Sequence, residues 1–295
     1  MFDMFATTQN SLQAFVNAIQ ILSADLQHFQ DDAYKGTDYT FQSLFSKSMT
    51  AVSGGTSPHG GVAAPATANI PSGLTLIPTG INFTQGSIKA GRALNAAVIG
   101  QDFFVVQAAI GSQFYYKRKS DFTFDSSGRL QDSFGRSVMG YRVVNGVADT
   151  SRLVPITLDP TTQDLFDVGF ETDGVLMTNF NARETARQRQ EANTIIPPGT
   201  ALFQLGLAKF ANPSKIAPIE GSAYSPTTGS GNPIAYGRSG EAGFSTVQGT
   251  AAEASNVNPA DITVLGIQLQ RGYNAVLSSL TTINKVITDF ISKVS

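Results

Sequence analysis

The sequence predicts an α+β protein, in which long N- and C-terminal helices pack together as a coiled-coil-like core domain and the middle of the chain forms an antiparallel β-rich body. Apolar residues recur in alternating steps of three and four at both ends of the chain. Between the ends, short apolar or alternating runs are separated by turn sequences. The predicted parts are an N-terminal helical part of the core domain (1–50), a Gly/Ser/Ala/Pro-rich linker (51–70), the β-rich body (71–250) and a C-terminal helical part of the core domain (251–295).

The N-terminal helix carries one narrow apolar seam. Its seam residues form two interleaved series with members seven residues apart, which places them on one face of a helix. The remaining positions hold mainly amides, so the opposite face is polar and carries little charge. The seam residues are Leu12, Ile19 and Leu26 in one series, and Phe15, Leu22 and Phe29 in the other.

The C-terminal helix repeats this pattern over a longer stretch. Asn258 followed by Pro259 predicts a helix start, and the helix should run from about Pro259 to Lys293, on the order of 50 Å at ~1.5 Å per residue. Gly266 interrupts its second series. The seam residues are Ile262, Leu269, Val276, Ile283 and Phe290, with Tyr273, Leu280 and Ile287 between them.

Two such helices in an isolated chain would leave much apolar surface in water, forgoing roughly 25 cal/mol per Å². We therefore expect contacts between subunits to complete the seams. Phe15, Leu22, Leu269 and Ile283 in particular are expected to become buried only when subunits meet.

The middle of the chain is typical of hairpins. Asn145-Gly146 follows the run Ser137–Val144, and Asp173-Gly174 follows Phe170. Such dipeptides between apolar runs favour tight antiparallel turns. Helical pattern is nearly absent there except over Ala182–Ala192, which predicts a short exposed helix or a long arm.

Composition excludes several function classes. The 295 residues carry a net charge of −2 with 14% charged residues, which supplies no basic surface for nucleic acid or an anionic membrane. The absence of cysteine excludes disulfides, thiolate metal sites and a cysteine nucleophile. We expect no membrane insertion and no cleavable secretory signal, because no window approaches roughly 18 consecutive apolar residues and the first thirty residues lack a basic start.

Candidate catalytic groups do not form a recognisable constellation, and we expect no enzyme activity, cofactor or metal. The two histidines, His28 and His59, have no partner at a useful spacing, and no Gly-x-Ser-x-Gly sequence marks a nucleophile. Paired carboxylates for glycosidase chemistry are the remaining alternative. The candidates sit beside turn sequences, where acidic residues are expected for turn geometry: Asp121, Asp125, Glu171 and Asp173.

Three groups of basic or glycine-rich residues have ordinary structural interpretations. Tyr115-Tyr116-Lys117-Arg118-Lys119 is interpreted as a strand edge, where lysine discourages unwanted pairing. Gly229–Gly243, which contains Arg238, is interpreted as a surface loop. Arg183, Arg187 and Arg189 alternate with Glu184 and Glu191, which is typical of a solvated face.

Several strings resemble those of the flagellar axial proteins, the hook and rod subunits of the bacterial flagellum. Ser255-Asn256-Val257-Asn258 and Gln270-Arg271-Gly272-Tyr273 are similar to the family's Ser-Asn-Val-Asp and Gln-Arg-Ala-Tyr. A second match consists of Gln85, Gly86, Gly100, Phe103 and Phe104, in the family's order. The chain departs from the family at Ala24–His28 and at Ala33-Tyr34-Lys35, where the family has Asn-Asn-Leu-Ala-Asn and Gly-Phe-Lys.

This resemblance implies a structural subunit of the basal-body rod, which self-assembles into a helical tube that transmits torque. It implies partnership with copies of itself, with other axial proteins and with the flagellar export apparatus, and export without a cleavable signal. Length and Pro71-Ser72-Gly73-Leu74 make it most similar to subunits of the distal rod. The alternatives are a flagellar hook subunit, or a non-flagellar oligomeric tail or adhesin-type binding protein.

Overall fold

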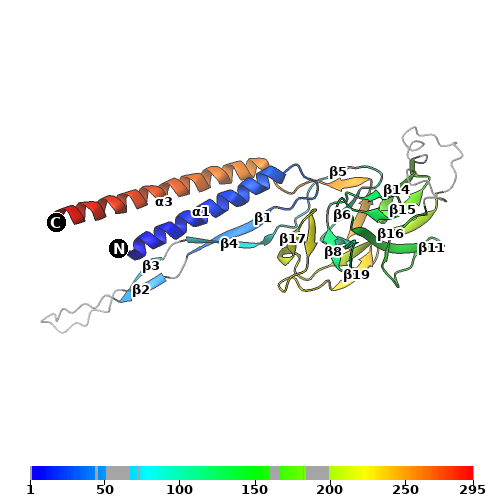
Figure 1. Cartoon of the computed structure of the whole chain (residues 1–295), viewed down its shortest axis with the longest axis horizontal. Coiled ribbons are helices and arrows are strands. Elements are labelled where there is room, and N and C mark those ends of the chain that lie inside the picture. Colours follow the sequence, from blue (N-terminus) through cyan, green and yellow to red (C-terminus); the bar gives the residue numbers. More distant parts are fainter. Residues whose placement is uncertain are drawn as a thin grey trace. The chain divides into compact units, whose positions relative to one another are not determined.

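A computed structural model describes residues 2–43, 46–50, 67–71, 74–159, 167–181, 183 and 199–294 (Figure 1). The chain forms two compact units, and its α+β class is confirmed. The helical unit comprises Met1–Gln27, Thr37–Thr79 and Asn258–Ser295, and the β unit comprises His28–Gly36 and Gly80–Val257. Within the described residues, neither helix is long and apolar enough to cross a membrane.

The helical unit consists of two helices and a paired ribbon of strands. Helix α1 spans Phe2–His28 and α3 spans Pro259–Val294, in agreement with the start and end predicted for the second helix. The two run antiparallel, with the N and C termini at the same end (Figure 1). Strand β1 (Thr37–Ser43) pairs with β4 (Leu74–Ile81), and β2 (Ser46–Thr50) pairs with β3 (Thr67–Pro71).

Strands β1 and β2 correct the prediction of a helical segment over residues 1–50. Tyr39 and Phe41 alternate with polar residues, which is the period of a strand, and both rings pack against the core between the helices. The strand therefore covers that core with one face. The linker prediction lies outside the described residues for 51–66, and residues 67–70 belong to β3.

The β unit is built from hairpins around one large sheet. The order along the sheet is β14-β15-β16-β11-β7-β8-β18-β17, and β9, β10, β12, β13 and β19 pair at its sides. β6 pairs with β20, and β5 pairs with β21. Its strands are β5 Ile88–Ala90, β6 Ala96–Ile99, β7 Phe103–Gln107, β8 Phe114–Lys117, β9 Thr123–Phe124, β10 Leu130–Gln131, β11 Ser137–Val144, β12 Val147–Ala148, β13 Val154–Pro155, β14 Val168–Phe170, β15 Val175–Thr178, β16 Ala201–Lys209, β17 Ala217–Ile219, β18 Ala223–Ser225, β19 Ala235–Arg238, β20 Thr246–Gly249 and β21 Ala251–Glu253.

The predicted turn at Asn145-Gly146 is confirmed. Val144 pairs with Val147, so the turn has two residues, with φ of 55° at Asn145 and 78° at Gly146. Positive φ at both positions belongs to the type I′ hairpin, which matches the twist of the flanking strands.

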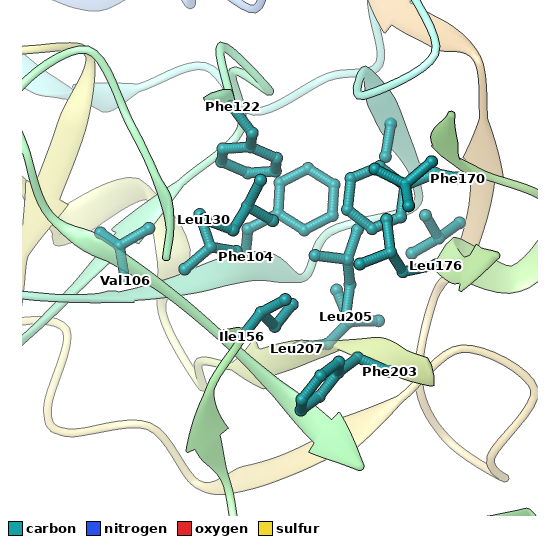
Figure 2. Close-up of a cluster of buried hydrophobic side chains, with 14 of the residues drawn as sticks. Phe104, Val106, Phe122, Leu130, Ile156, Phe170, Leu176, Phe203, Leu205 and Leu207 are labelled. Atoms are coloured by element: carbon teal, nitrogen blue, oxygen red, sulfur yellow. The ribbon is translucent and has the colours of Figure 1, made fainter. Parts of the chain in front are cut away.

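Strand β7 lies at the centre of the β unit and is buried on both faces. Phe104 and Val106 point into one core, where Phe104 and Phe170 both pack edge-to-face on Phe122 (Figure 2). Phe103 and Val105 point into a second core on the opposite side. Burial on both faces explains the unbroken apolar run of this strand.

Two interpretations of basic or glycine-rich segments are wrong. Lys117 and Arg118 are not at an exposed edge, because β8 lies between β7 and β18 and their exposed fractions are 0% and 1%. Residues 229–243 are not only a loop, since β19 within them pairs with β16. The predicted helix or arm over 182–192 lies outside the described residues except for Arg183.

Candidate functional site

The candidate functional site is the apolar surface of the two terminal helices. Leu22 and Leu269 form its centre with Ala18, and their exposed fractions are 6% and 4%. The expectation that these two leucines are buried only between subunits is therefore wrong, because they pack against each other's helix within one chain. Phe15 lies on Gly272, where an added Cβ would stand 2.6 Å from the phenyl ring.

The other seam positions are only partly covered. Leu26, whose exposed fraction is 44%, and Phe290, at 62%, are exposed, and Phe29 lies after the end of α1 in the β unit. The half-buried positions are Leu12, Phe15, Ile19, Phe29, Ile262, Tyr273, Val276, Leu280, Ile283 and Ile287. A single chain thus buries the middle of the seam better than its ends.

Helix α3 extends beyond α1. It has 36 residues against 27, and since Phe15 lies opposite Gly272 in an antiparallel pair, Phe2 falls opposite about residue 285. The last turns of α3 therefore have no partner on α1. We call the exposed large apolar residues of α3 the uncovered set: Val264, Ile267, Leu277, Val286, Phe290 and Ile291, with exposed fractions from 38% to 62%. Burying them would favour association by roughly 25 cal/mol per Å².

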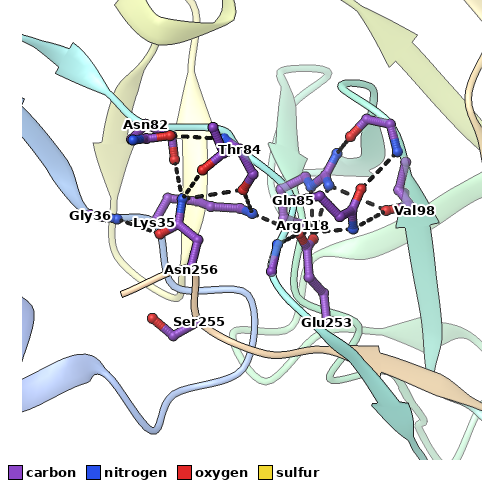
Figure 3. Close-up of polar contacts among 12 residues, drawn as sticks. Lys35, Gly36, Asn82, Thr84, Gln85, Val98, Arg118, Glu253, Ser255 and Asn256 are labelled. Atoms are coloured by element: carbon purple, nitrogen blue, oxygen red, sulfur yellow. Dashed lines mark hydrogen bonds and ion pairs between the residues drawn. The ribbon is translucent and has the colours of Figure 1, made fainter. Parts of the chain in front are cut away.

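The residues that carried the resemblance fall into two places. In the β unit, Gln85 donates to the Val98 carbonyl at 3.0 Å and accepts the Gly100 N–H at 2.9 Å (Figure 3). A Cβ on Gly86 would clash with the Ala254 carbonyl, so glycine is required at that position. Phe103 and Phe104 belong to the two cores.

Asn256 joins three segments of the β unit. Its amide nitrogen donates to the Asn82 carbonyl at 2.7 Å, and its amide oxygen accepts the Gly36 N–H at 3.0 Å (Figure 3). Ser255 Oγ accepts the Val257 N–H at 3.1 Å. On α3, Gln270 and Arg271 are exposed and Tyr273 is half-buried. These motif residues therefore lie in both units.

The sequence did not identify the buried ion pairs beside Asn256. Glu253 accepts from Lys35 at 2.6 Å and from Arg118 at 2.9 Å, and all three side chains are fully buried. Burial lowers the pKa of Lys35, although Glu253 opposes this by favouring the ammonium form. The sequence does carry one signal, the acid inside the small-residue run Ala251-Ala252-Glu253-Ala254. An acid in a buried strand requires a partner of opposite charge.

The four carboxylates considered for catalysis have structural partners. Asp125 accepts the N–H groups of Ser127 and Arg129, both at 2.9 Å, and the Ser127 hydroxyl lowers its pKa. This confirms Asp125 as a turn residue. Asp121 pairs with Lys117 at 2.6 Å, Glu171 with Arg183 at 3.0 Å, and Asp173 accepts from Ser239 at 2.7 Å. Among the described residues, no cluster of potential ligands could hold a metal ion.

Comparison with known proteins finds similar proteins of the bacterial flagellum. No family model matches the chain. The flagellar basal-body rod protein FlgG of Agrobacterium fabrum is 29% identical over 224 residues, which are 75% of this chain and 73% of that protein. The rod protein FlgG of Bacillus subtilis is 22% identical over 283 residues, which are 96% of both chains.

The chain is also similar to a flagellar hook protein. The hook match, to the hook protein FlgE of Helicobacter pylori, is 30% identical over 129 residues, which are 44% of this chain and 16% of the hook protein. The rod protein of Bacillus subtilis therefore matches over nearly the whole chain, whereas the hook protein matches over less than half of it.

Proposed function

We propose that this chain is a structural subunit of the bacterial flagellar rod, located in the basal body. The observation that carries the proposal is the match to rod protein over 96% of both chains, together with the apolar residues that the terminal helices leave uncovered. A hook subunit is the alternative. The hook match covers 16% of the hook protein, so the length of this chain favours the rod.

The proposed mechanism is assembly through the terminal helices. α1 and α3 of one subunit associate with those of its neighbours as a coiled-coil-like inner core. The subunit interface is formed by the uncovered set and by the seam residues that one chain leaves exposed or half-buried, which excludes Leu22 and Leu269. Apolar contact supplies the attraction. A tube built in this way transmits torque because each helix is held along its length by neighbouring helices.

The proposed partners are copies of the same chain and the other axial proteins of the flagellum. We propose further that the chain reaches its place through the flagellar export apparatus, without a cleavable signal. Nucleic acid and membrane insertion have no part in this proposal, and it requires no catalytic step.

The test uses a charge on the uncovered set. Phe290→Asp places a carboxylate where the proposal buries an apolar side chain, which costs several kcal/mol at each subunit contact. Because Phe290 is 62% exposed, the single chain should fold normally. We expect wild-type protein at high concentration to form tubes in electron microscopy and Phe290→Asp to remain monomeric.

The matched control is Val147→Asp, at a β-hairpin position that is 65% exposed. It makes the same kind of change in the β unit and should still assemble. Normal tubes from Phe290→Asp, combined with failure of Val147→Asp, would overturn the assignment of the interface to the helices. Closed oligomers of the wild type would favour the tail or adhesin-type alternative.

A further inference from the structure

We infer that Glu253 is a positioning residue for assembly, because it holds together the segments through which the chain passes between the β unit and the helical unit. This inference rests on the proposed function. The chain passes between the units after Gln27, Gly36, Thr79 and Val257. The residues joined by Glu253 and Asn256 flank three of these points, and all of them belong to the β unit.

The Glu253 carboxylate is saturated with donors. Oε1 accepts from Lys35 Nζ at 2.6 Å, from Gln85 Nε2 at 3.0 Å and from the Gly86 N–H at 3.0 Å. Oε2 accepts from Arg118 Nε at 3.1 Å and from Nη2 at 2.9 Å. Figure 3 shows these groups converging on one side chain.

Arg118 is the anchor of this cluster in the β unit. Its Nη1 donates to the carbonyls of Gly100 and Asp102, both at 2.7 Å, so its position depends on the loop between β6 and β7. Glu253 connects this anchor to Lys35, whose Nζ also donates to the Thr84 carbonyl at 2.8 Å. A force on the segment around Lys35 is therefore passed through a charge pair to the core of the β unit.

Backbone bonds connect the same segments. The Ala33 N–H donates to the Glu253 carbonyl at 2.7 Å, and the Asn256 N–H donates to the Tyr34 carbonyl at 3.3 Å. The segment before β1 and the segment before α3 thus lie side by side within the β unit. Asn256 then connects both to Asn82.

The charges of Lys35, Arg118 and Glu253 allow these segments to adopt only one arrangement. A buried cation without its counterion is strongly unfavourable, so Lys35 and Arg118 are stable in place only when Glu253 is between them. The partners are 218 and 135 residues from Glu253 in the chain. One carboxylate therefore requires the beginning, middle and end of the chain to adopt a single arrangement, which a regular polymer needs in every subunit.

The test compares Glu253→Gln with Asp132→Asn in the full-length chain. Asp132 is the control, because it is equally buried, pairs with buried Lys117 at 3.1 Å and bonds none of the residues 31–36, 82–86 and 254–257 in which exchange is measured. Both changes replace an acid by an amide of the same shape. The measurements are hydrogen exchange of single chains and the critical concentration for assembly.

For Glu253→Gln we expect hydrogen exchange at residues 31–36, 82–86 and 254–257 to accelerate by about 100-fold or more, with the exchange of β7 and β16 little changed. The critical concentration should rise by at least about tenfold. Asp132→Asn should change neither quantity at these places. Unchanged exchange in Glu253→Gln, or equal effects from Asp132→Asn, would overturn the inference.

Lys35→Met keeps the test decisive if Glu253→Gln does not fold. It leaves the Glu253–Arg118 pair intact and releases only the segment around residue 35, so exchange should accelerate there and assembly should weaken. Normal exchange and assembly in Lys35→Met would contradict the role of the cluster. A wild-type chain that does not polymerise would count against the proposed function, whereas the exchange measurement would still test Glu253.

Discussion

The β unit and the helical unit differ in how completely they bury their apolar residues. In the β unit, the central side chains of β7 and β16 are fully buried by other parts of the same unit. Among the described residues of the helical unit, the buried cluster consists of Ala18, Leu22 and Leu269, and six large apolar residues of α3 are exposed: Val264, Ile267, Leu277, Val286, Phe290 and Ile291. The first unit has a complete core, whereas the second has a core that neighbouring molecules can extend.

The largest difference in stability between the two units is expected when a buried side chain of the β unit is shortened. Phe104→Ala removes a fully buried ring that packs on Phe122 and should lower the free energy of unfolding of the β unit by about 3–5 kcal/mol. Denaturant unfolding followed by tyrosine fluorescence checks this. Phe290→Ala is the control and should cost the single chain less than about 0.5 kcal/mol. Equal losses would show that the two units do not differ in this way.

The next effect appears at alkaline pH. Burial raises the pKa of Tyr116, assisted by its hydrogen bond with Tyr236, and burial also raises the pKa of Tyr224, so the folded β unit keeps both protons above the ordinary pKa of 10.0. The unfolded chain loses them there. Stability from these groups is complete below pH 10 and falls as pH rises, by up to about 1.4 kcal/mol per pH unit for each group.

Denaturant titrations between pH 9 and 11 measure this slope. Tyr116→Phe and Tyr224→Phe should each reduce it by about the contribution of one group. A slope that neither substitution changes would show that these two groups do not cause the alkaline sensitivity.

The smallest effect is expected at Ala33, which has a φ of 57°. The left-handed conformation costs a residue with a Cβ about 1–2 kcal/mol, whereas losing this buried methyl group costs about 0.8 kcal/mol. Ala33→Gly should therefore stabilise the β unit by a few tenths to about 1 kcal/mol in denaturant unfolding. Ala252→Gly, in strand β21, should destabilise instead, and a loss from Ala33→Gly would mean that methyl packing outweighs backbone strain.

Local patterns predicted the elements whose causes are local. The bounds of α3 followed from a sustained seven-residue period and from Asn258-Pro259, and β11 followed from the turn at Asn145-Gly146. The alternation of Tyr39 and Phe41 is likewise a local pattern and indicates a strand, which the prediction of a helical part over residues 1–50 did not separate from the helix. These features depend on residues within a few positions of one another.

Features that depend on distant partners were not predictable in the same way. Nothing next to Arg118 indicates that it is buried, because its counterion is 135 residues away. Nor does the period of a seam indicate how much of it one chain covers. That depends on the register between α1 and α3, in which Phe15 lies opposite Gly272.

The unequal length of the two helices has a mechanical consequence in a polymer of the proposed kind. The final turns of α3, with Val286, Phe290 and Ile291 exposed, can overlap a neighbouring subunit along their sides, as in a lap joint. Such a joint carries load as shear spread over the overlapped length, and apolar contacts suit it because they are not directional. Its strength grows with overlap, so the projecting turns of α3 would contribute to the stiffness of the rod in proportion to their length.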